Sequence, residues 1–215
     1  MIEQIKNFLK RYLFFKKILE TYSLSHEYLK ATGWMRSWEL SASVDQDGHP
    51  IPWLSYPAIA FLKDRIKPDF QVFEYGAGAS TLWFARQVRS VVSCEHEEAW
   101  FKRVQQMTAG LTNVELFFVP LAEGYSTKIQ DYKKQFDVIV IDGRQRNQCA
   151  MNSLEALNDR GVLLFDNADR ASYQEGITFL LRAGFKKIDF TGLTPLAHRQ
   201  ITTAIFYKND NCLGI

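Results

Sequence analysis

The sequence predicts an α/β fold: a doubly wound, seven-stranded, mostly parallel sheet that carries an N-terminal helical extension. Three observations predict it. Short apolar runs alternate with helix-like segments five times and are followed by two further runs, as in repeated βα units. Residues 136–141 (FDVIVI) are apolar enough for a central strand covered on both faces. Residues 70–81 (FQVFEYGAGAST) read as a strand, a glycine turn and a helix start.

Length and composition describe one ordinary globular domain with an extension. The chain has 215 residues, of which 47% are hydrophobic and 23% charged, and a net charge of +2. So small a net charge gives no overall field for nucleic acid. Cys94, Cys149 and Cys212 are odd in number and lack metal-type spacing. With no apolar run long enough for a membrane span and no secretory leader, we expect a cytoplasmic protein.

The first segment, residues 2–22, is predicted to be a helix with one apolar and one basic face. Three alternatives stay open: a helix packed on its own domain, a homodimer seam, or a helix lying on a membrane surface. Apolar residues recur at spacings of three and four, and lysines share another face: Ile5, Phe8, Tyr12, Phe15 and Leu19; Lys6, Lys10 and Lys17.

Residues 1–51 are assigned to the helical extension and residues 52–215 to the main domain. We expect a helical, lid-like segment over residues 23–47 and an extended connector over residues 49–53, where two prolines exclude helix. Trp53 and Tyr56 are candidates to stack on a ligand, although buried packing is the simpler interpretation of each.

The remaining elements follow from apolar periodicity and from Gly or Pro breakers. Trp100, Val104, Met107 and Leu111 are expected to be core residues rather than ligand contacts. Predicted strands are 72–75, 90–95, 114–119, 136–141, 162–165, 185–190 and 202–207. Predicted helices are 56–66, 80–88, one through Trp100 to Leu111, one through Ala150, Leu154 and Leu157, and 173–183.

The glycine turn carries an acidic residue two positions before its first glycine, Glu74-x-Gly76-x-Gly78. Thr81 stands where a dinucleotide fingerprint has its third glycine. The pattern resembles motif I (E/D-x-G-x-G) of the class I S-adenosylmethionine-dependent methyltransferases, which have a Rossmann-like seven-stranded sheet. The resemblance covers about residues 52–208. It implies that the last strand is antiparallel and that the acid faces the cationic methionine end of the cofactor.

The resemblance also implies further cofactor contacts. An acid at the end of the second strand binds the ribose hydroxyls in that family, and here that position is Glu95. The alternative is that Glu95 only caps the next helix. The expected cofactor-binding residues are Glu74, Gly76, Gly78, Ser80, Thr81, Glu95 and Asp142.

Acids also end the fourth and fifth predicted strands, so all these residues should lie at one sheet edge. Asp142, Asp166 and Asn167 resemble the metal site of the catechol-type O-methyltransferases, which implies a Mg²⁺ ion that lowers the pKa of a substrate hydroxyl. The family's lysine after the first metal ligand is replaced by Gln145. The base is then Asp142 itself in a metal-free version, or His198.

Four arginines on nearby loops point to an anionic acceptor, with solvated surface arginines as the alternative: Arg144, Arg146, Arg170 and Arg199. Nucleic acid is not expected as the acceptor, because Asp142-Gly143-Arg144 replaces the N/D-P-P-Y/F motif of the nucleic-acid amine methyltransferases.

The resulting hypothesis is an S-adenosylmethionine-dependent methyltransferase (EC 2.1.1 type) that acts on oxygen of a small molecule or glycan. Two alternatives are an NAD(P)-dependent oxidoreductase on a related fold and a catalytically idle cofactor-binding module.

Overall fold

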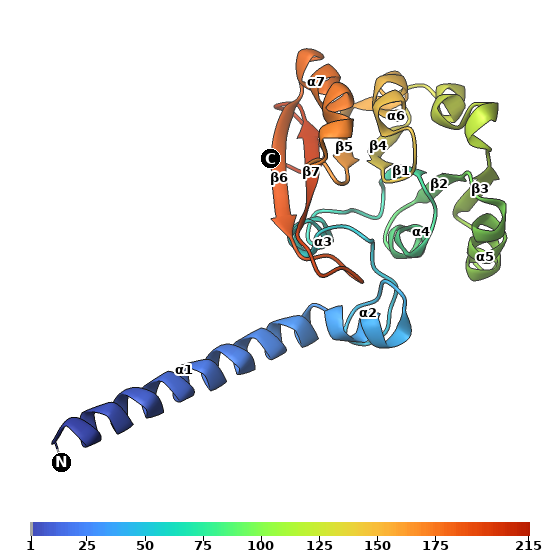
Figure 1. The fold of residues 1–215 in the computed structure, drawn as a ribbon. Helices are drawn as coiled ribbons and strands as arrows, with labels where there is room; N and C mark the ends of the chain where they lie inside the picture. Colours follow the sequence, from blue (N-terminus) through green and yellow to red (C-terminus); the bar gives the residue numbers. More distant parts are fainter. Residues whose placement is uncertain (1) are drawn as a thin grey trace.

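A seven-stranded sheet forms the centre of the molecule, in the order β3-β2-β1-β4-β5-β7-β6 (Figure 1). The computed structural model describes residues 2–215, except for the side chains at positions 2, 3, 5 and 7–9. The strands are β1 (Gln71–Tyr75), β2 (Ser90–Glu95), β3 (Val114–Phe118), β4 (Phe136–Ile141), β5 (Leu157–Phe165), β6 (Lys186–Gly192) and β7 (Ile201–Tyr207).

Helices cover both faces of this sheet (Figure 1). One layer holds α3, α4 and α5, and the other holds η2, α6 and α7. The α-helices are α1 (Ile2–Ala31), α2 (Trp34–Leu40), α3 (Tyr56–Lys63), α4 (Ala79–Ala85), α5 (Glu98–Thr108), α6 (Arg146–Asn152) and α7 (Gln174–Arg182). Three 3₁₀ segments are η1 (Leu121–Glu123), η2 (Tyr125–Asp131) and η3 (Ala171–Tyr173).

Alternation along the strands divides the core into two halves, one on each side of the sheet. In β4, Ile139 and Ile141 pack toward Tyr125 and the α6–α7 layer, whereas Val138 and Val140 pack toward the α3–α4 layer. Successive side chains of a strand point to opposite faces, so an unbroken apolar run is required where both faces are covered. The prediction that residues 136–141 form a central, doubly covered strand is confirmed.

The sheet is mixed, which corrects the expected mostly parallel sheet. Strands β1 to β5 pair in parallel, but β7 runs antiparallel to both β5 and β6. No helix separates β6 from β7, so the chain returns directly and reverses its direction.

Several predicted boundaries differ from those of the structure, two of them markedly. Helix α1 continues past residue 22 to Ala31, where the Ser25 hydroxyl donates to the Thr21 carbonyl (2.7 Å) and keeps a polar residue compatible with the helix. The helix predicted through Leu157 ends at Asn152, and Leu157 already pairs with Phe136 as the first residue of β5.

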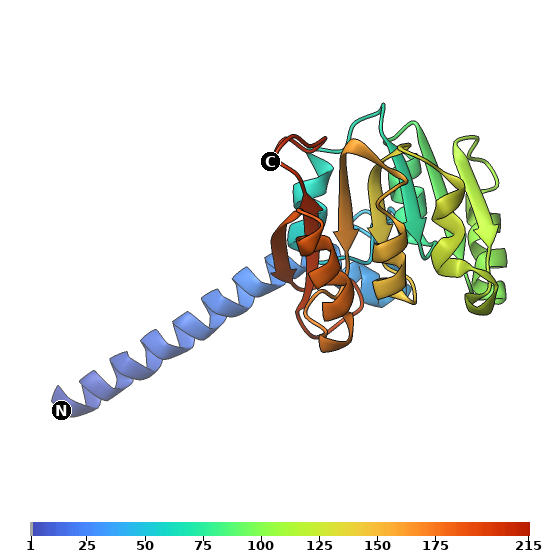
Figure 2. The ribbon, with the colours of Figure 1, turned by 90° about the horizontal axis from the view of Figure 1, so that it is seen from above.

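Helix α1 projects away from the rest of the molecule, and only its C-terminal end meets α2 (Figures 1 and 2). Tyr12, Phe15 and Leu19 are exposed, so the packing of this face on its own domain is not observed; Ile5 and Phe8 of the predicted stripe lie outside the described side chains. Within the described residues, no helix combines the length and apolar character needed to cross a bilayer.

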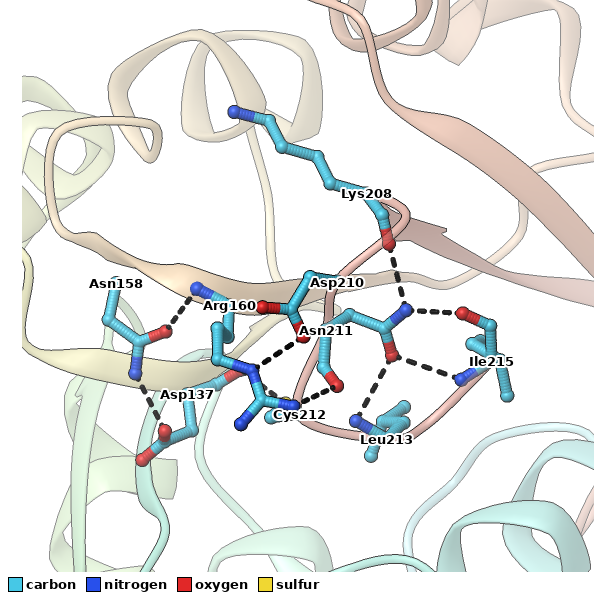
Figure 3. A network of polar contacts seen from close by, with 9 residues as sticks. All are labelled: Asp137, Asn158, Arg160, Lys208, Asp210, Asn211, Cys212, Leu213 and Ile215. Carbon is cyan, nitrogen blue, oxygen red and sulfur yellow. Dashed lines mark hydrogen bonds and ion pairs between the residues drawn. The ribbon is translucent and has the colours of Figure 1, made fainter.

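A network of polar contacts holds the C-terminal segment against β4 and β5 (Figure 3). Arg160 donates from Nε to Asp210 Oδ1 (2.9 Å), and the Cys212 backbone N–H donates to the Arg160 carbonyl (2.7 Å). Nearby, Asn158 Nδ2 donates to Asp137 Oδ1 (2.6 Å). These contacts join the starts of β4 and β5 to the chain end and leave the carboxyl ends of the strands free.

Candidate functional site

A cavity of about 590 Å³ opens beyond the carboxyl ends of β1, β2 and β4. This is the sheet edge at which open α/β folds bind ligands. Its volume suits a ligand of nucleoside size. Its lining includes Ser41, Ala42, Ser43, Val44, Pro50, Trp53, Gly76, Ala77, Gly78, Ser80, Glu95, Trp100, Arg103, Met107, Asp142, Arg144 and Arg146.

Gly76 forms the floor of this cavity and has to be glycine. Its φ is +93°, and a Cβ atom there would lie 3.1 Å from the Gly143 Cα atom on the neighbouring strand end. Gly78 is different, because its φ of 170° is open to any residue and an added Cβ would make ordinary contact with Trp100 at 3.7 Å. Its missing side chain instead leaves backbone exposed to the cavity.

Glu74 and Thr81 lie behind the cavity rather than in its wall. Both are fully buried. Ser93 Oγ donates to Glu74 Oε2 (2.8 Å), and the Gly78 N–H donates to Thr81 Oγ1 (3.0 Å). Burial raises the pKa of Glu74 to about 7, although hydroxyl hydrogen bonds from Thr81, Ser80 and Ser93 oppose the shift. Of the expected cofactor contacts around the turn, Gly76, Gly78 and Ser80 line the cavity.

Glu95 lines the cavity but already holds backbone groups. Its Oε1 accepts from the N–H groups of His96 (2.7 Å) and Glu97 (2.9 Å), and Oε2 accepts from the Ala77 N–H (3.3 Å). The helix-start interpretation is therefore part of its role. Oε2, with one long hydrogen bond, is the oxygen that can accept a further bond.

Trp100 and Met107 are cavity residues, which corrects their assignment to the core. The indole Nε1 of Trp100 donates to the Ala77 carbonyl (2.7 Å), fixing the ring beside the glycine turn. Arg103 lies over the same ring, 5.4 Å from its centroid. Of the expected core set, Val104 is fully buried. The helical spacing was correctly interpreted, but it could not tell a cavity-facing aromatic from a core one.

The extension contributes to the cavity as well. Ser41 to Val44 and Pro50 form one wall, although residues 1–51 were expected to lie outside the main domain. Ser37 anchors this wall, because its Oγ donates to the Val44 carbonyl (2.9 Å) and accepts from the Val44 N–H (3.1 Å). The domain boundary stays a prediction, but the cavity draws residues from both sides of it.

A second cavity of about 300 Å³ adjoins the first. Trp53, Asp142 and Arg146 line both cavities and so mark where they meet. Trp53 is half exposed, whereas Tyr56 is buried and lies elsewhere. The other lining residues of the second cavity are Asp166, Asn167, Arg170, Thr194, Ala197, Arg199 and Ile201.

Arg146 joins the acids at the ends of β4 and β5. Its Nη2 donates to Asp142 Oδ1 (2.8 Å) and to the Asp142 carbonyl (2.9 Å), while Nε donates to the Gly143 carbonyl (3.0 Å). Its Nη1 donates to the Asp166 carbonyl and lies 3.6 Å from Asp166 Oδ2. Tyr173 covers the guanidinium, 5.1 Å from the ring centroid. Arg146, expected on a loop near this sheet edge with a solvated position as the alternative, is the first residue of α6 and is buried.

This arrangement does not fit the expected Mg²⁺ site. A guanidinium already lies between the two carboxylates, and a divalent cation between Asp142 and Asp166 would meet that positive charge. Asp166 Oδ1 is also taken by the Thr203 hydroxyl (2.7 Å). Asn167 forms a left-handed turn (φ 55°) and lines the second cavity.

Asp142 keeps a face open to the cavities, with 26% of its side chain exposed. Burial and the neighbouring carboxylate of Asp166 raise its pKa well above the ordinary range, while Arg146 opposes the shift. Its Oδ1 accepts a hydrogen bond from Arg146, so the orientation of the carboxylate is fixed. A carboxylate with a raised pKa is suited to accept a proton.

His198, the other candidate base, lies outside both cavities. Its ring stacks on Trp38 at a centroid distance of 4.3 Å and contacts the edge of Trp34 at 6.1 Å. His198 therefore packs the loop that precedes β7 against α2.

Known structures share this fold. A precorrin-6y C5,15-methyltransferase from Geobacter metallireducens superposes with a TM-score of 0.56 at 17% identity, covering 71% of this chain and 88% of that one. SMU.1697c, a Streptococcus mutans putative methyltransferase in complex with SAH, gives 0.53 at 12% identity, covering 69% and 94%. This chain therefore shares the α/β fold of these two proteins.

A third similar structure, a methyltransferase from Geobacter sulfurreducens, has a TM-score of 0.52 at 21% identity and covers 74% of this chain and 81% of that one. No model of a known protein family matches the chain, and no curated protein matches it. The similarity to the catechol-type enzymes is not confirmed, and these structures do not identify the acceptor.

Proposed function

We propose that the protein is an S-adenosylmethionine-dependent methyltransferase that methylates an oxygen atom of a small-molecule or glycan acceptor. The observation that carries the proposal is the meeting of the two cavities at Asp142. A cofactor in the larger cavity and an acceptor in the smaller one would have their reacting groups beside the same carboxylate. Such placement accounts for much of the catalysis that methyl transfer requires.

In this proposal the cofactor occupies the cavity at Gly76, Gly78 and Ser80, with Glu95 Oε2 as a hydrogen-bond acceptor for its ribose. Bound S-adenosylmethionine supplies an electrophilic methyl group. Trp100 forms an apolar wall, fixed by its hydrogen bond to the Ala77 carbonyl. Glu74 lies behind the glycine turn, from where its buried carboxylate would attract the positive charge of the cofactor.

Asp142 is the proposed general base. Asp142 would take the proton of the acceptor hydroxyl while its oxygen gains the methyl group, the methyl–sulfur bond breaks and S-adenosylhomocysteine is left. Arg146 orients the Asp142 carboxylate through Oδ1 and supplies positive charge where the family resemblance implied Mg²⁺. Proton transfer to a positioned carboxylate is worth on the order of 10²–10⁴ in rate.

An anionic acceptor is favoured by the charges of the second cavity. Arg170 and Arg199 line it, and within the described residues neither guanidinium forms an ion pair with a carboxylate. Both are free to bind a carboxylate or phosphate group at the outer end of the cavity while the acceptor hydroxyl lies at Asp142.

Matched acceptor pairs test this proposal. Formation of S-adenosylhomocysteine is measured with acidic glycans or hydroxy acids and with their neutral amides, in the presence of EDTA. We expect turnover with an acidic acceptor, a much higher KM for its amide, and loss of that preference in Arg170→Gln/Arg199→Gln. Methyl transfer to nitrogen acceptors alone would contradict the O-methylation proposal.

A further inference from the structure

Helix α1 carries an apolar stripe that nothing else in the described chain covers, and further exposed apolar side chains lie on its other faces: Leu13, Phe14 and Ile18. Tyr12, Phe15 and Leu19 follow one another at spacings of three and four, which places them on one face. Their exposed fractions are 59%, 64% and 58%. The helix extends away from the sheet domain, so this stripe is open along its length (Figures 1 and 2).

Basic side chains border the stripe on both sides. Arg11 lies four residues before Phe15, and Lys16 lies four residues after Tyr12, so each is a helical neighbour of one edge. Lys16 is 3.8 Å from Glu20, but this exposed pair is weak. Two more exposed lysines lie on the opposite face, Lys10 and Lys17.

The positive charge of the protein is concentrated in this helix. Residues 1–19 contain five basic side chains and one acidic side chain, a surplus of four, whereas the whole chain has a net charge of only +2. The remainder of the chain is therefore net negative. Helix α1 therefore attracts anionic partners, whereas the net negative remainder of the chain does not.

We propose that α1 lies on an anionic membrane surface, with Tyr12, Phe15 and Leu19 at the headgroup–acyl boundary and Arg11 and Lys16 at the lipid phosphates. Long basic side chains reach the headgroups while their stems lie along the apolar surface. Within the described residues no helix is long and apolar enough to span a bilayer, and we place α1 in the interface plane. Aromatic residues are favoured at that depth.

A second copy of the chain fits this face less well. If the stripe formed a coiled-coil seam, Arg11 and Lys16 would occupy the positions that flank it, against the same basic residues of the other copy. Like charges at these positions oppose pairing. Arg11 and Lys16 are complementary in charge to lipid phosphates but repel the same residues of a second copy, so lipid binding is favoured over self-association.

The test uses the full chain and vesicle co-sedimentation. Vesicles of phosphatidylcholine with about one-third phosphatidylserine are compared with pure phosphatidylcholine, and we expect at least about tenfold stronger binding to the anionic vesicles. Phe15→Ser should weaken binding about tenfold, the effect of losing one buried aromatic side chain. Phe14→Ser is the matched control, because Phe14 is equally exposed but lies off the stripe.

Charge reversal gives the second comparison. Arg11→Glu/Lys16→Glu should abolish binding to anionic vesicles, whereas Arg89→Glu/Lys133→Glu, the same charge change on the sheet domain, should reduce it much less. Equal binding to neutral vesicles, or equal losses for Phe14→Ser and Phe15→Ser, would overturn the proposal. So would a lipid-free dimer in sedimentation velocity that Phe15→Ser dissociates, without vesicle binding.

Discussion

Arg146 Nη2 lies 2.8 Å from Asp142 Oδ1, and the same guanidinium reaches Asp166 on the next strand. The buried cation thereby links the ends of β4 and β5 at the place where the two cavities meet. Its contacts include three backbone carbonyls, those of Asp142, Gly143 and Asp166. Arg146 therefore fixes the backbone of the site as well as its charge.

Arg146→Met is expected to lower the free energy of unfolding by about 3–5 kcal/mol, because it leaves the buried carboxylate of Asp166 and the partly buried carboxylate of Asp142 without their counter-charge. Arg170→Met is the matched control: its guanidinium also lies near the Tyr173 ring, at 5.9 Å, but it is exposed and should cost less than about 1 kcal/mol. Urea denaturation at neutral pH measures both. Similar small losses would show that Arg146 is not the structural link.

Asp142→Asn should lower kcat by about 10²-fold or more and leave S-adenosylhomocysteine affinity within a few-fold. The Asn amide cannot accept the proton, but it has the shape of the carboxylate and its oxygen can still accept the hydrogen bond from Arg146. Because the pKa of Asp142 is raised, wild-type turnover should fall with decreasing pH well above the ordinary Asp range, as the base becomes protonated. A variant with unchanged kcat would remove Asp142 from the mechanism.

Turnover should not respond to EDTA or to added Mg²⁺, because Arg146 lies between the two carboxylates expected to bind the ion. The measurement is the initial rate of an identified acceptor reaction before and after chelation. If EDTA abolished turnover and Mg²⁺ restored it, a metal ion would be part of the mechanism and Arg146 would have a different role.

Glu74 makes stability depend on pH in a defined window. Its pKa is about 7 in the folded protein and 4.5 ordinarily, so the folded state favours the protonated form. This contribution is complete below pH 4.5 and is lost as pH rises toward 7, a change of about 3 kcal/mol. Glu74→Gln should remove that part of the pH dependence in urea unfolding measured across the window. An unchanged profile would assign the slope to other groups.

The glycine turn offers a pair of alanine substitutions with different outcomes. Gly76→Ala should destabilise the fold by about 1–3 kcal/mol, because φ is +93° and the new Cβ would lie 3.1 Å from Gly143. Gly78→Ala should unfold like the wild type yet bind cofactor more weakly, since the Cβ would meet only Trp100 and the cavity. Thermal unfolding and calorimetry separate the two effects.

The sequence predicted strands 90–95 and 136–141 to the residue, because an apolar run ending in an acid leaves little choice of element. It could not predict the role of Arg146. A basic residue four positions after an acid resembles any exposed helical pair, and its burial depends on Tyr173 and Asp166, which come from a later part of the chain. Such packing has no periodic signature in the sequence.

The cavity wall from the extension was missed for a related reason. Ser41 to Val44 lie there because Gly33, the N-cap of α2, has a φ of +81°, and a Cβ on Gly33 would lie 2.5 Å from the Val44 carbonyl oxygen. The turn at Gly33 and the segment from Ser41 to Val44 that packs against it hold each other in place. Neither Gly33 nor Val44 predicts this contact from its own position in the sequence.

Isothermal titration calorimetry with S-adenosylhomocysteine, with NADH as the comparison ligand, tests the central claim most directly. We predict one site per chain for S-adenosylhomocysteine, no heat with NADH, and loss of the binding heat in Gly78→Val, whose side chain would enter the cavity. NADH binding without S-adenosylhomocysteine binding, or no binding of either ligand by folded protein, would contradict the assignment of this site.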